Sequence, residues 1–246
     1  MSGKRRLDCL LVERGLIVSR ELARRMVLAG EVLVNGHPCT KAGHPVPTDA
    51  EVTVKARPRF VSRGGDKLQA AFDELGLDVR EADCIDIGAS TGGFTDCLLQ
   101  HGARHVVAVD VGKGQLHWNL RTDPRVTVIE GCNARFLTAA DVPLMPSVAT
   151  FDVSFISLTL VMPPVTQMLT PGGALVTLIK PQFEAGREHV GKGGVVRDAA
   201  VHEAVVARIR AFGTTTLGLR WVGCCESPIR GPAGNVEYVA LWRKAT

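Results

Sequence analysis

Residues 84–96 read Cys84-Ile-Asp86-Ile-Gly88-Ala-Ser-Thr-Gly92-Gly93-Phe-Thr-Asp96, and the rest of the architecture can be worked out from them. The short apolar run with β-branched isoleucines predicts a buried strand. The glycines end that strand in a tight turn, and residues 94–100 have helical spacing. A strand, a glycine turn and a helix together place a nucleotide-like ligand against backbone amides and a helix N-terminus. Glycine suits such a turn because it accepts positive φ and has no Cβ to obstruct the ligand.

A second apolar strand is predicted at residues 106–109, and it ends in Asp110, 24 positions after Asp86. An acidic residue about 20 positions past a glycine turn can accept hydrogen bonds from both ribose hydroxyls of an adenosine. The turn lacks the G-x-G-x-x-G pattern of dinucleotide sites, so an adenosine without phosphates is favoured. S-adenosylmethionine fits this description. An ordinary βα turn followed by an unrelated acid remains an alternative at this point.

Strands and helices alternate along the remainder of the chain. Further strands are expected at residues 126–129, 147–151, 174–179 and 219–224, with a last one ending at Trp242, and helices at residues 163–169 and 199–212. The early strands are almost wholly apolar, which is typical of a parallel sheet covered on both faces. We therefore predict an α/β protein with a Rossmann-like sheet, preceded by a small α+β domain.

Composition limits the classes of protein to consider. The chain has 246 residues and is 46% hydrophobic, enough for a substantial core. Its longest apolar runs are far too short to cross a bilayer, and no signal-peptide pattern follows the N-terminus, so a cytoplasmic location is expected. The seven cysteines are odd in number and show no metal-ligand spacing, which argues against a disulfide framework and against structural zinc.

Positive charge is concentrated at the N-terminal end. Residues 1–63 carry 12 Lys or Arg and 6 Asp or Glu, a net charge of +6; the whole chain carries +4, which leaves −2 for residues 64–246. Within this part, two short helices are predicted, the second capped by Ser19, followed by a strand that enters an Asn35-Gly36 turn. A basic module on a nearly neutral body suggests polyanion binding, although a charged, solvated face is the simpler interpretation.

The motifs of this module resemble a known RNA-binding domain. Arg6-Leu-Asp-Cys-Leu-Leu-Val-Glu-Arg-Gly15-Leu, then Ser19-Arg20, then Gly30-Glu-Val-Leu-Val-Asn35-Gly36 are similar to the S-four type (αL) domain of ribosomal proteins and RNA-modifying enzymes. Lysines and arginines gathered in one module are what contacts to RNA phosphates require. The residues expected to bind RNA are Lys4, Arg5, Arg6, Arg20, Arg24, Lys41 and, beyond the module, Arg63.

Two charged residues directly follow predicted strands. Open α/β sheets bind ligands at the carboxyl ends of their strands, and Asp152 and Lys180 both stand at such ends. A lysine placed after a buried strand is costly to keep charged unless it is paired or catalytic. Taken singly, a strand-end cap and a surface lysine are equally good interpretations of these two residues.

The chain resembles the FtsJ-like ribose 2′-O-methyltransferases, which carry a tetrad of lysine, aspartate, lysine and glutamate (K-D-K-E). The residues that match this tetrad, in the same order, are Lys67, Asp152, Lys180 and Glu237. In particular the chain resembles the TlyA family, in which an S-four type domain is fused to such a methyltransferase. The segments that carry this resemblance are Ser62-Arg-Gly-Gly-Asp-Lys67-Leu, Asp86-Ile-Gly-Ala-Ser-Thr-Gly-Gly-Phe-Thr, Asp110-Val-Gly-Lys-Gly-Gln-Leu, Asp152-Val-Ser-Phe-Ile-Ser, Lys180-Pro-Gln-Phe-Glu, Val190-Gly-Lys-Gly-Gly-Val-Val and Gly234-Asn-Val-Glu237-Tyr.

The resemblance implies an RNA-binding domain over residues 1–57, a linker over 58–62 and a methyltransferase domain over 63–246. It also implies methylation of the ribose 2′-oxygen of cytidine in ribosomal RNA, with ribosomal subunits as partners. Lys180 is the expected base for the ribose hydroxyl, helped by Lys67, while Asp152 and Glu237 hold the two lysines. No metal is expected, because a sulfonium is already an activated methyl donor. The residues expected to hold S-adenosylmethionine are Gly88, Ala89, Ser90, Thr91, Gly92, Gly93, Asp110, Asn133 and Asp152.

Three other functions are alternatives for this sequence. A nicotinamide-dependent oxidoreductase would need the missing dinucleotide motif. Many members of the family carry a hemolysin label, but a membrane-lytic protein would need an amphipathic or spanning segment, and no convincing one is present. An RNA-binding protein with an inactive methyltransferase domain is disfavoured by the intact tetrad.

The RNA target follows from the resemblance as an expectation. Some members modify only 23S rRNA and others both 16S and 23S, the latter being extended at the C-terminus by a helical segment. Only four residues follow Trp242 here, too few for a stable helix, whereas the basic residues 4–6 fit a dual enzyme. Weighing the two ends, we expect 23S rRNA to be the target, with weak or no modification of 16S rRNA.

Overall fold

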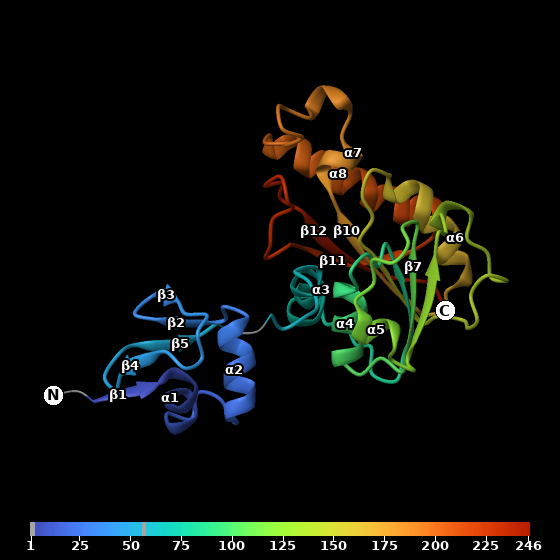
Figure 1. The fold of residues 1–246 in the computed structure, drawn as a ribbon. Helices are drawn as coiled ribbons and strands as arrows, with labels where there is room; N and C mark the ends of the chain where they lie inside the picture. The colour runs from blue at the N-terminus through green and yellow to red at the C-terminus, as the bar shows by residue number, and fades with distance from the viewer. Residues whose placement is uncertain (1–2, 56–57) are drawn as a thin grey trace. The chain divides into compact units, whose positions relative to one another are not determined.

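The computed structural model describes residues 3–55 and 58–246, and the chain divides into two compact units, residues 1–57 and 58–246. The two ends of the predicted N-terminal domain, residues 1–2 and 56–57, lie outside the described residues. Each unit has its own buried core. Figure 1 shows the helices and strands of both units.

The N-terminal unit contains two helices and two small sheets. Its elements are β1 (Lys4–Arg6), α1 (Leu7–Glu13), α2 (Arg20–Leu28), β2 (Val32–Val34), β3 (His37–Pro38), β4 (Pro45–Pro47) and β5 (Val52–Val54). Both predicted helices form, and the Ser19 hydroxyl accepts a hydrogen bond from the Leu22 N–H at 3.3 Å, as an N-cap does. The apolar faces of α1 and α2 pack on the three-stranded sheet β3-β2-β5, which gives the unit its core.

The pairing of β1 with β4 was not predicted. Arg5 faces Val46 in this antiparallel ladder, and a proline stands on each side of the valine. Proline cannot donate to a ladder and is found at sheet edges, so the sequence of β4 reads as a loop. Because of this pairing, the basic residues of β1 are held on a strand that leads directly into α1.

The second unit is built on a seven-stranded sheet of order β11-β12-β10-β9-β6-β7-β8. The strands are β6 (Asp83–Ile87), β7 (His105–Asp110), β8 (Val126–Glu130), β9 (Val148–Phe151), β10 (Ala174–Ile179), β11 (Arg220–Glu226) and β12 (Tyr238–Arg243). The five strands from β10 to β8 in this order are parallel, while β12 pairs antiparallel with β10, and β11 antiparallel with β12. The predicted α/β class with a mostly parallel sheet is confirmed.

Helices cover both faces of this sheet (Figure 1). They are α3 (Gly64–Asp73), α4 (Gly93–Gln100), α5 (Trp118–Arg121), α6 (Leu158–Met168), α7 (Pro181–Glu184) and α8 (Ala199–Ala211). The cores show the two layers: side chains of α3, α4 and α5 lie in one buried cluster, and those of α6 and α8 in the other. Such a sandwich leaves the ends of the parallel strands as the place for a ligand.

The helix predicted at residues 163–169 begins earlier than expected, at Leu158, and carries Pro163 and Pro164 inside it. The prolines suggested a helix start, because proline is favoured in a first turn. The actual start is set by Ser157, whose hydroxyl accepts from the Thr159 N–H at 3.2 Å, and by the distant Glu184 carboxylate, which accepts from the Leu158 N–H at 2.7 Å. A cap supplied from 26 residues away leaves no local signal in the sequence.

No helix within the described residues has the length and apolar character that crossing a membrane requires.

Candidate active site

The carboxyl ends of β6, β9 and β10 meet at one edge of the sheet, and two of the four tetrad residues come directly after these strands. Asp152 follows β9, and its N–H donates to the Ile87 carbonyl at the end of β6 at 2.9 Å. Lys180 follows β10. The antiparallel strand β12 starts at the same edge, because Ile179 faces Tyr238 in the register. Glu237, just before Tyr238, therefore emerges beside Lys180.

The tetrad forms two lysine–carboxylate pairs. Lys67, in the first turn of α3, lies with its Nζ 2.6 Å from Glu237 Oε2, across 170 residues of sequence. Lys180 Nζ lies 2.5 Å from Asp152 Oδ1. The lysine side chains are 11% and 7% exposed, and that of Glu237 is 1% exposed. Ammonium groups this deeply buried require compensation, and each has one carboxylate.

Two residues that the sequence did not single out complete this arrangement. The Ser154 hydroxyl accepts a hydrogen bond from Lys180 Nζ at 3.1 Å, and Gln182 Nε2 donates to Glu237 Oε1 at 3.3 Å. Because Gln182 follows Lys180 by two residues, it links the two pairs through α7. Both residues lie inside segments that resemble the family, but nothing in their type or spacing points to a contact with a lysine or a glutamate.

The predicted cofactor turn makes its closest approach to the rest of the site at Gly88. This residue has φ of 82°, and a Cβ at its position would lie 2.5 Å from the Asp152 carbonyl oxygen. Gly92, at φ of 97°, caps α4, and a Cβ there would overlap the side chain of Leu120. Only glycine combines positive φ with such close packing, so the turn is held tightly against the loop after β9.

Asp110 organises the second cofactor segment. Its Oδ2 accepts from the Ser90 N–H at 2.8 Å, and its Oδ1 accepts from the Gly112 N–H at 2.7 Å. The carboxylate therefore ties the turn after β6 to the loop after β7. Since each carboxylate oxygen has a second lone pair, both oxygens can still accept from ribose hydroxyls.

Two adjoining pockets follow this edge of the sheet. One, of about 440 Å³, is bordered by most of the predicted adenosine-binding residues, namely Gly88, Ser90, Asp110, Asn133 and Asp152. The other, of about 200 Å³, is bordered by Lys67, Asp152 and the turn residues Gly88, Ala89, Ser90, Thr91 and Gly93. Gly92 borders neither pocket and acts as the cap of α4. Asp152 is common to both pockets, so a molecule that filled both would pass beside it, whereas Lys180 and Glu237 are lining residues of neither pocket.

A buried acid lies beneath the turn. Asp86, on β6, is fully buried and accepts hydrogen bonds from the hydroxyls of Thr95 at 2.7 Å and Thr150 at 2.8 Å. Burial raises the pKa of Asp86 to about 6, against the two hydroxyl hydrogen bonds, which lower it, and with a small further rise from the Asp152 charge. The acid connects β6 to α4 and β9 and does not border either pocket.

One exposed aromatic residue stands at the rim. Phe155 is 90% exposed and has φ of 63°, a strained value for a bulky side chain. Its ring centroid lies 4.9 Å from that of Phe183, and it borders the larger of the two pockets. An exposed ring held in a strained conformation beside a cleft is a candidate ligand contact. The sequence shows only a phenylalanine after a strand, which is ordinarily a core residue.

Six of the seven residues predicted to bind RNA lie in the N-terminal unit, and all seven are exposed. Arg6 and Arg20 are ion-paired with Asp8, while Arg5 lies 3.9 Å from Glu13. Arg63 belongs to the second unit, where it precedes α3 and borders the smaller pocket.

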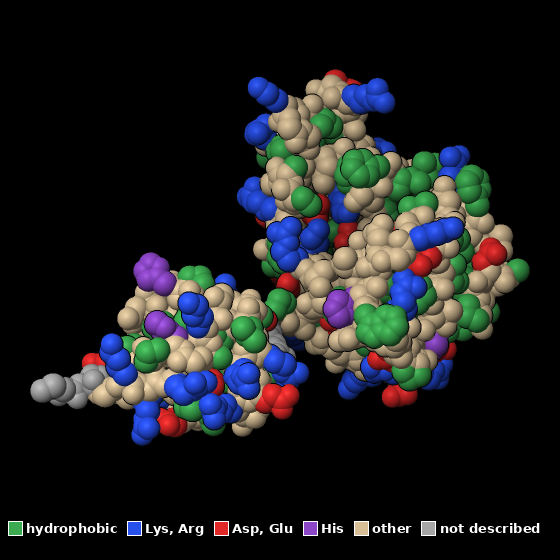
Figure 2. All heavy atoms as spheres, in the orientation of Figure 1, with side chains coloured by type: hydrophobic (Ala, Val, Ile, Leu, Met, Phe, Trp, Pro, Cys, Tyr) green, Lys and Arg blue, Asp and Glu red, His purple; other side chains and the backbone are tan. Residues whose placement is uncertain are grey.

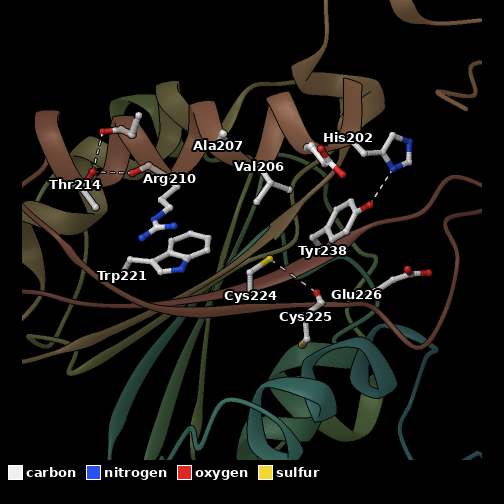
Figure 3. A pocket seen from close by; sticks show the side chains of 12 residues that line it. His202, Val206, Ala207, Arg210, Thr214, Trp221, Cys224, Cys225, Glu226 and Tyr238 are labelled. Carbon is white, nitrogen blue, oxygen red and sulfur yellow. Dashed lines mark hydrogen bonds between the residues drawn. The ribbon is translucent and has the colours of Figure 1, made fainter. Parts of the chain in front are cut away.

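A pocket of about 570 Å³ lies elsewhere in the second unit, between α8 and the edge strand β11 (Figure 3). His202 and Tyr238 are hydrogen-bonded there at 3.0 Å, and the guanidinium of Arg210 lies 5.4 Å from the ring centre of Trp221. Despite its volume, this pocket is lined by none of the predicted site residues, and β11 is not one of the five parallel strands of the sheet. The edge of the sheet that carries the tetrad is the better candidate for an active site, because buried charged side chains lie there beside the tightly packed glycine turn.

Comparisons with known proteins identify the family to which the chain belongs. The family model described as FtsJ-like methyltransferase matches residues 60–244, and the S4 domain model matches residues 5–52. The "Putative rRNA methyltransferase YqxC" of Bacillus subtilis is 50% identical over 97% of this chain and 85% of its own length. The "16S/23S rRNA (cytidine-2'-O)-methyltransferase TlyA" of Mycobacterium tuberculosis is 43% identical over 98% of this chain and 90% of its own. The "23S rRNA (cytidine-2'-O)-methyltransferase TlyA" of Campylobacter jejuni is 31% identical over 95% and 97%.

Among solved structures, one described as "Putative hemolysin from Streptococcus thermophilus" is 44% identical and superposes with a TM-score of 0.75, covering 100% of this chain and 90% of that one.

Proposed function

Because this chain belongs to the TlyA family of FtsJ-like methyltransferases, we propose that it methylates the ribose 2′-oxygen of a cytidine in ribosomal RNA, with S-adenosylmethionine as the donor. The observation that carries the proposal is the pair of buried lysine–carboxylate contacts at the end of the parallel sheet. In these pairs the lysine Nζ lies 2.5 Å or 2.6 Å from a carboxylate oxygen. The four residues come from separate parts of the chain and lie at the edge of the sheet where the two pockets meet.

The two pockets suit an adenosine joined to a short charged chain. Asp110 offers free lone pairs for ribose hydroxyls, and Asn133 borders the same pocket, where an adenine would lie. The turn from Gly88 to Gly93 has no side chain beyond that of a threonine, so its backbone amides are open to the ligand. Bound there, S-adenosylmethionine would supply a methyl group already activated by its positive sulfur.

Lys180 is the proposed base for the ribose hydroxyl. A neutral amine has two N–H groups and one lone pair, and the described residues give Lys180 Nζ two acceptors, Asp152 and Ser154. When both N–H groups donate to these acceptors, the lone pair lies in the remaining tetrahedral direction. Lys180 can then take the hydroxyl proton as the ribose oxygen attacks, and Asp152 balances the ammonium that forms.

The second pair has a positioning role. Glu237 holds Lys67 by an ion pair and receives a further hydrogen bond from Gln182, so the Lys67 ammonium is fixed at the wall of the smaller pocket. A fixed cation there stabilises negative charge that develops on the ribose oxygen. At the rim, Phe155 offers a stacking surface for a base next to the reacting ribose.

RNA would be gathered by the basic residues of the N-terminal unit. The seven predicted RNA-binding residues are all exposed, and Lys and Arg dominate the charged side chains on the face of this unit seen in Figure 2. Phosphate contacts of this kind supply most of the affinity and little of the sequence specificity. Selection of the cytidine would fall to the second unit, where the chemistry occurs.

The target we propose is 23S rRNA, with ribosomal subunits in the cytoplasm as the partners. Both TlyA relatives described above are named for 23S rRNA, and one of them is named for 16S rRNA as well. Modification of 23S rRNA is therefore the shared activity, and modification of 16S rRNA is the one that separates the two relatives.

Two measurements test the proposal. A thermal-shift titration compares S-adenosylmethionine with NAD: stabilisation by the former alone is expected, and stabilisation by NAD alone would favour an oxidoreductase. Purified large and small subunits are then incubated separately with methyl-labelled S-adenosylmethionine. Label in the large subunit is expected; comparable label in both would remove the 23S preference, and none in either would contradict the proposed activity.

A further inference from the structure

One acidic side chain lies fully buried among the basic residues of the N-terminal unit. Asp8, in the first turn of α1, has an exposed fraction of 0%, although the three residues of β1, Lys4–Arg6, are all exposed. Its Oδ1 accepts from Arg6 Nε at 3.1 Å, and its Oδ2 accepts from Arg6 NH2 at 2.9 Å and from Arg20 Nε at 3.1 Å. The hydrogen bonds from Arg6 hold the pKa of Asp8 well below its usual range, so the side chain is an anion at physiological pH.

The two arginines meet at one carboxylate from different elements. Arg6 ends β1 and Arg20 begins α2, and their side chains are 51% and 57% exposed. Arg6 uses two of its five guanidinium N–H groups on Asp8 and Arg20 uses one, and among the described residues the hydrogen bonds to Asp8 are the side-chain hydrogen bonds that these two guanidinium groups donate. Arg6 is confined on a second side by Gly43, where a Cβ would lie 3.0 Å from its NH1 atom.

We propose that Asp8 is a positioning residue for RNA binding: its buried carboxylate holds Arg6 and Arg20 in the orientation in which both donate to RNA phosphates. The proposal rests on the proposed function, in which these two arginines bind RNA. Arginine recognises phosphate through a planar, two-pronged donor set, so orientation matters as well as charge. An arginine already held in place also loses less conformational freedom on binding than a free one.

For a neutral substitution of Asp8, simple electrostatics and a positioning role predict opposite changes in RNA affinity. Asp8→Asn removes a negative charge from a unit that binds a polyanion, which by charge alone strengthens binding. If Asp8 positions the arginines, the same change weakens binding. The asparagine keeps one acceptor oxygen but turns an amide N–H toward a guanidinium N–H, so at least one of the three hydrogen bonds and the negative charge of the shared anchor are lost. The direction of the change therefore separates the two explanations.

Glu13→Gln is the matched control. Glu13 also lies on α1 and faces an arginine, but it is 51% exposed and 3.9 Å from Arg5, so it holds nothing in place. Both variants change the net charge by one unit. Binding of the full-length protein to purified large ribosomal subunits is measured by co-sedimentation at several salt concentrations, with circular dichroism and S-adenosylmethionine affinity recorded for each variant.

We expect Asp8→Asn to weaken binding roughly five- to a hundredfold, the effect of leaving two arginine side chains to be ordered on binding, and to flatten the salt dependence. Glu13→Gln should leave binding unchanged or slightly tighter. Binding by Asp8→Asn that equals or exceeds that of the wild type overturns the positioning role. Arg20→Glu distinguishes a wrong positioning role for Asp8 from a wrong proposal that the arginines bind RNA. If Arg20→Glu also leaves binding unchanged, the arginines do not bind RNA at all.

A second variant covers the case in which Asp8→Asn does not fold. Arg6→Lys keeps the charge and the Asp8–Arg20 contact, but lysine cannot make the two-pronged contact of Arg6. Weakened binding by the folded Arg6→Lys protein is expected, and unchanged binding overturns the proposal.

Discussion

Replacement of Asp110 is expected to weaken S-adenosylmethionine binding, because its carboxylate is the proposed acceptor for two ribose hydroxyls and also holds the cofactor turn. In the structure its carboxylate already accepts the N–H groups of Ser90 and Gly112, at 2.8 Å and 2.7 Å. Asp110→Ala therefore removes the ribose acceptors and also releases the turn after β6 from the loop after β7. Asp110→Asn keeps the shape but turns an amide N–H toward one of these backbone donors.

The magnitude follows from the number of hydrogen bonds. A hydrogen bond to a charged group contributes about 1.5–3 kcal/mol. Two lost ribose contacts give at most about 3–6 kcal/mol for Asp110→Ala, a rise in Kd of roughly a hundred- to ten-thousandfold. Asp110→Asn loses at least one, so its Kd should rise roughly ten- to a hundredfold. Because Asp110 is only half-buried, values near the lower ends are expected.

Isothermal titration calorimetry with S-adenosylmethionine measures both variants, and Asp123→Asn is the control. Asp123 carries the same charge but forms a surface pair with Arg125 at 2.8 Å, away from both pockets, so its replacement should change Kd by less than about twofold. An Asp110→Ala protein with the affinity of the wild type would remove Asp110 from the cofactor site.

Four other substitutions or truncations have defined outcomes. Lys180→Ala should lower kcat roughly 10²- to 10⁴-fold with nearly unchanged S-adenosylmethionine affinity, because the lysine removes a proton; substantial activity at every pH would refute its role as the base. Ser154→Ala should lower kcat while leaving KM for RNA unchanged, and Ser154→Thr should restore it; equal rates for all three proteins would show that the 3.1 Å contact to Lys180 has no catalytic effect. The folded-state pKa of Asp86 is raised from 3.8 to about 6, so its stabilising contribution is complete below pH 3.8 and is lost as the pH rises through 6. Relative to wild type, Asp86→Asn should therefore gain up to about 3 kcal/mol in the free energy of unfolding between pH 4 and pH 7. A difference between the two proteins in urea unfolding that does not change with pH would contradict this. Removal of residues 1–57 should leave a folded protein that binds S-adenosylmethionine but does not methylate ribosomal subunits, whereas full activity of the truncated protein would exclude a need for the basic unit.

The sheet could be predicted from the sequence because its strands are short, mostly apolar and separated by clear turns. The run at residues 84–87 and the run at 174–179, which is apolar except for Thr177, both form strands of the predicted type. Prediction failed where a proline dominated the local pattern. Pro45 and Pro47 concealed an edge strand, and Pro163 suggested a helix start five residues too late.

The identity of the charged tetrad could be read from the order of its residues, but the contacts between them could not. Which lysine pairs with which carboxylate depends on β12 running antiparallel beside β10, a long-range feature without a local signal. The same holds for Ser154 and for Asp8, whose roles depend on distances to residues elsewhere in the fold. Polar side chains that act on other side chains, and not on a ligand, are the class that sequence patterns miss.

The central claim is that the product is a 2′-O-methylated cytidine in ribosomal RNA, made at the Lys180–Asp152 pair. The most direct test is mass spectrometry of nucleosides from large-subunit RNA treated with the wild-type protein, with Lys180→Ala in parallel. The account predicts 2′-O-methylcytidine with the wild type and almost none with the variant. A methyl group on the base, or equal amounts of 2′-O-methylcytidine with both proteins, would contradict it.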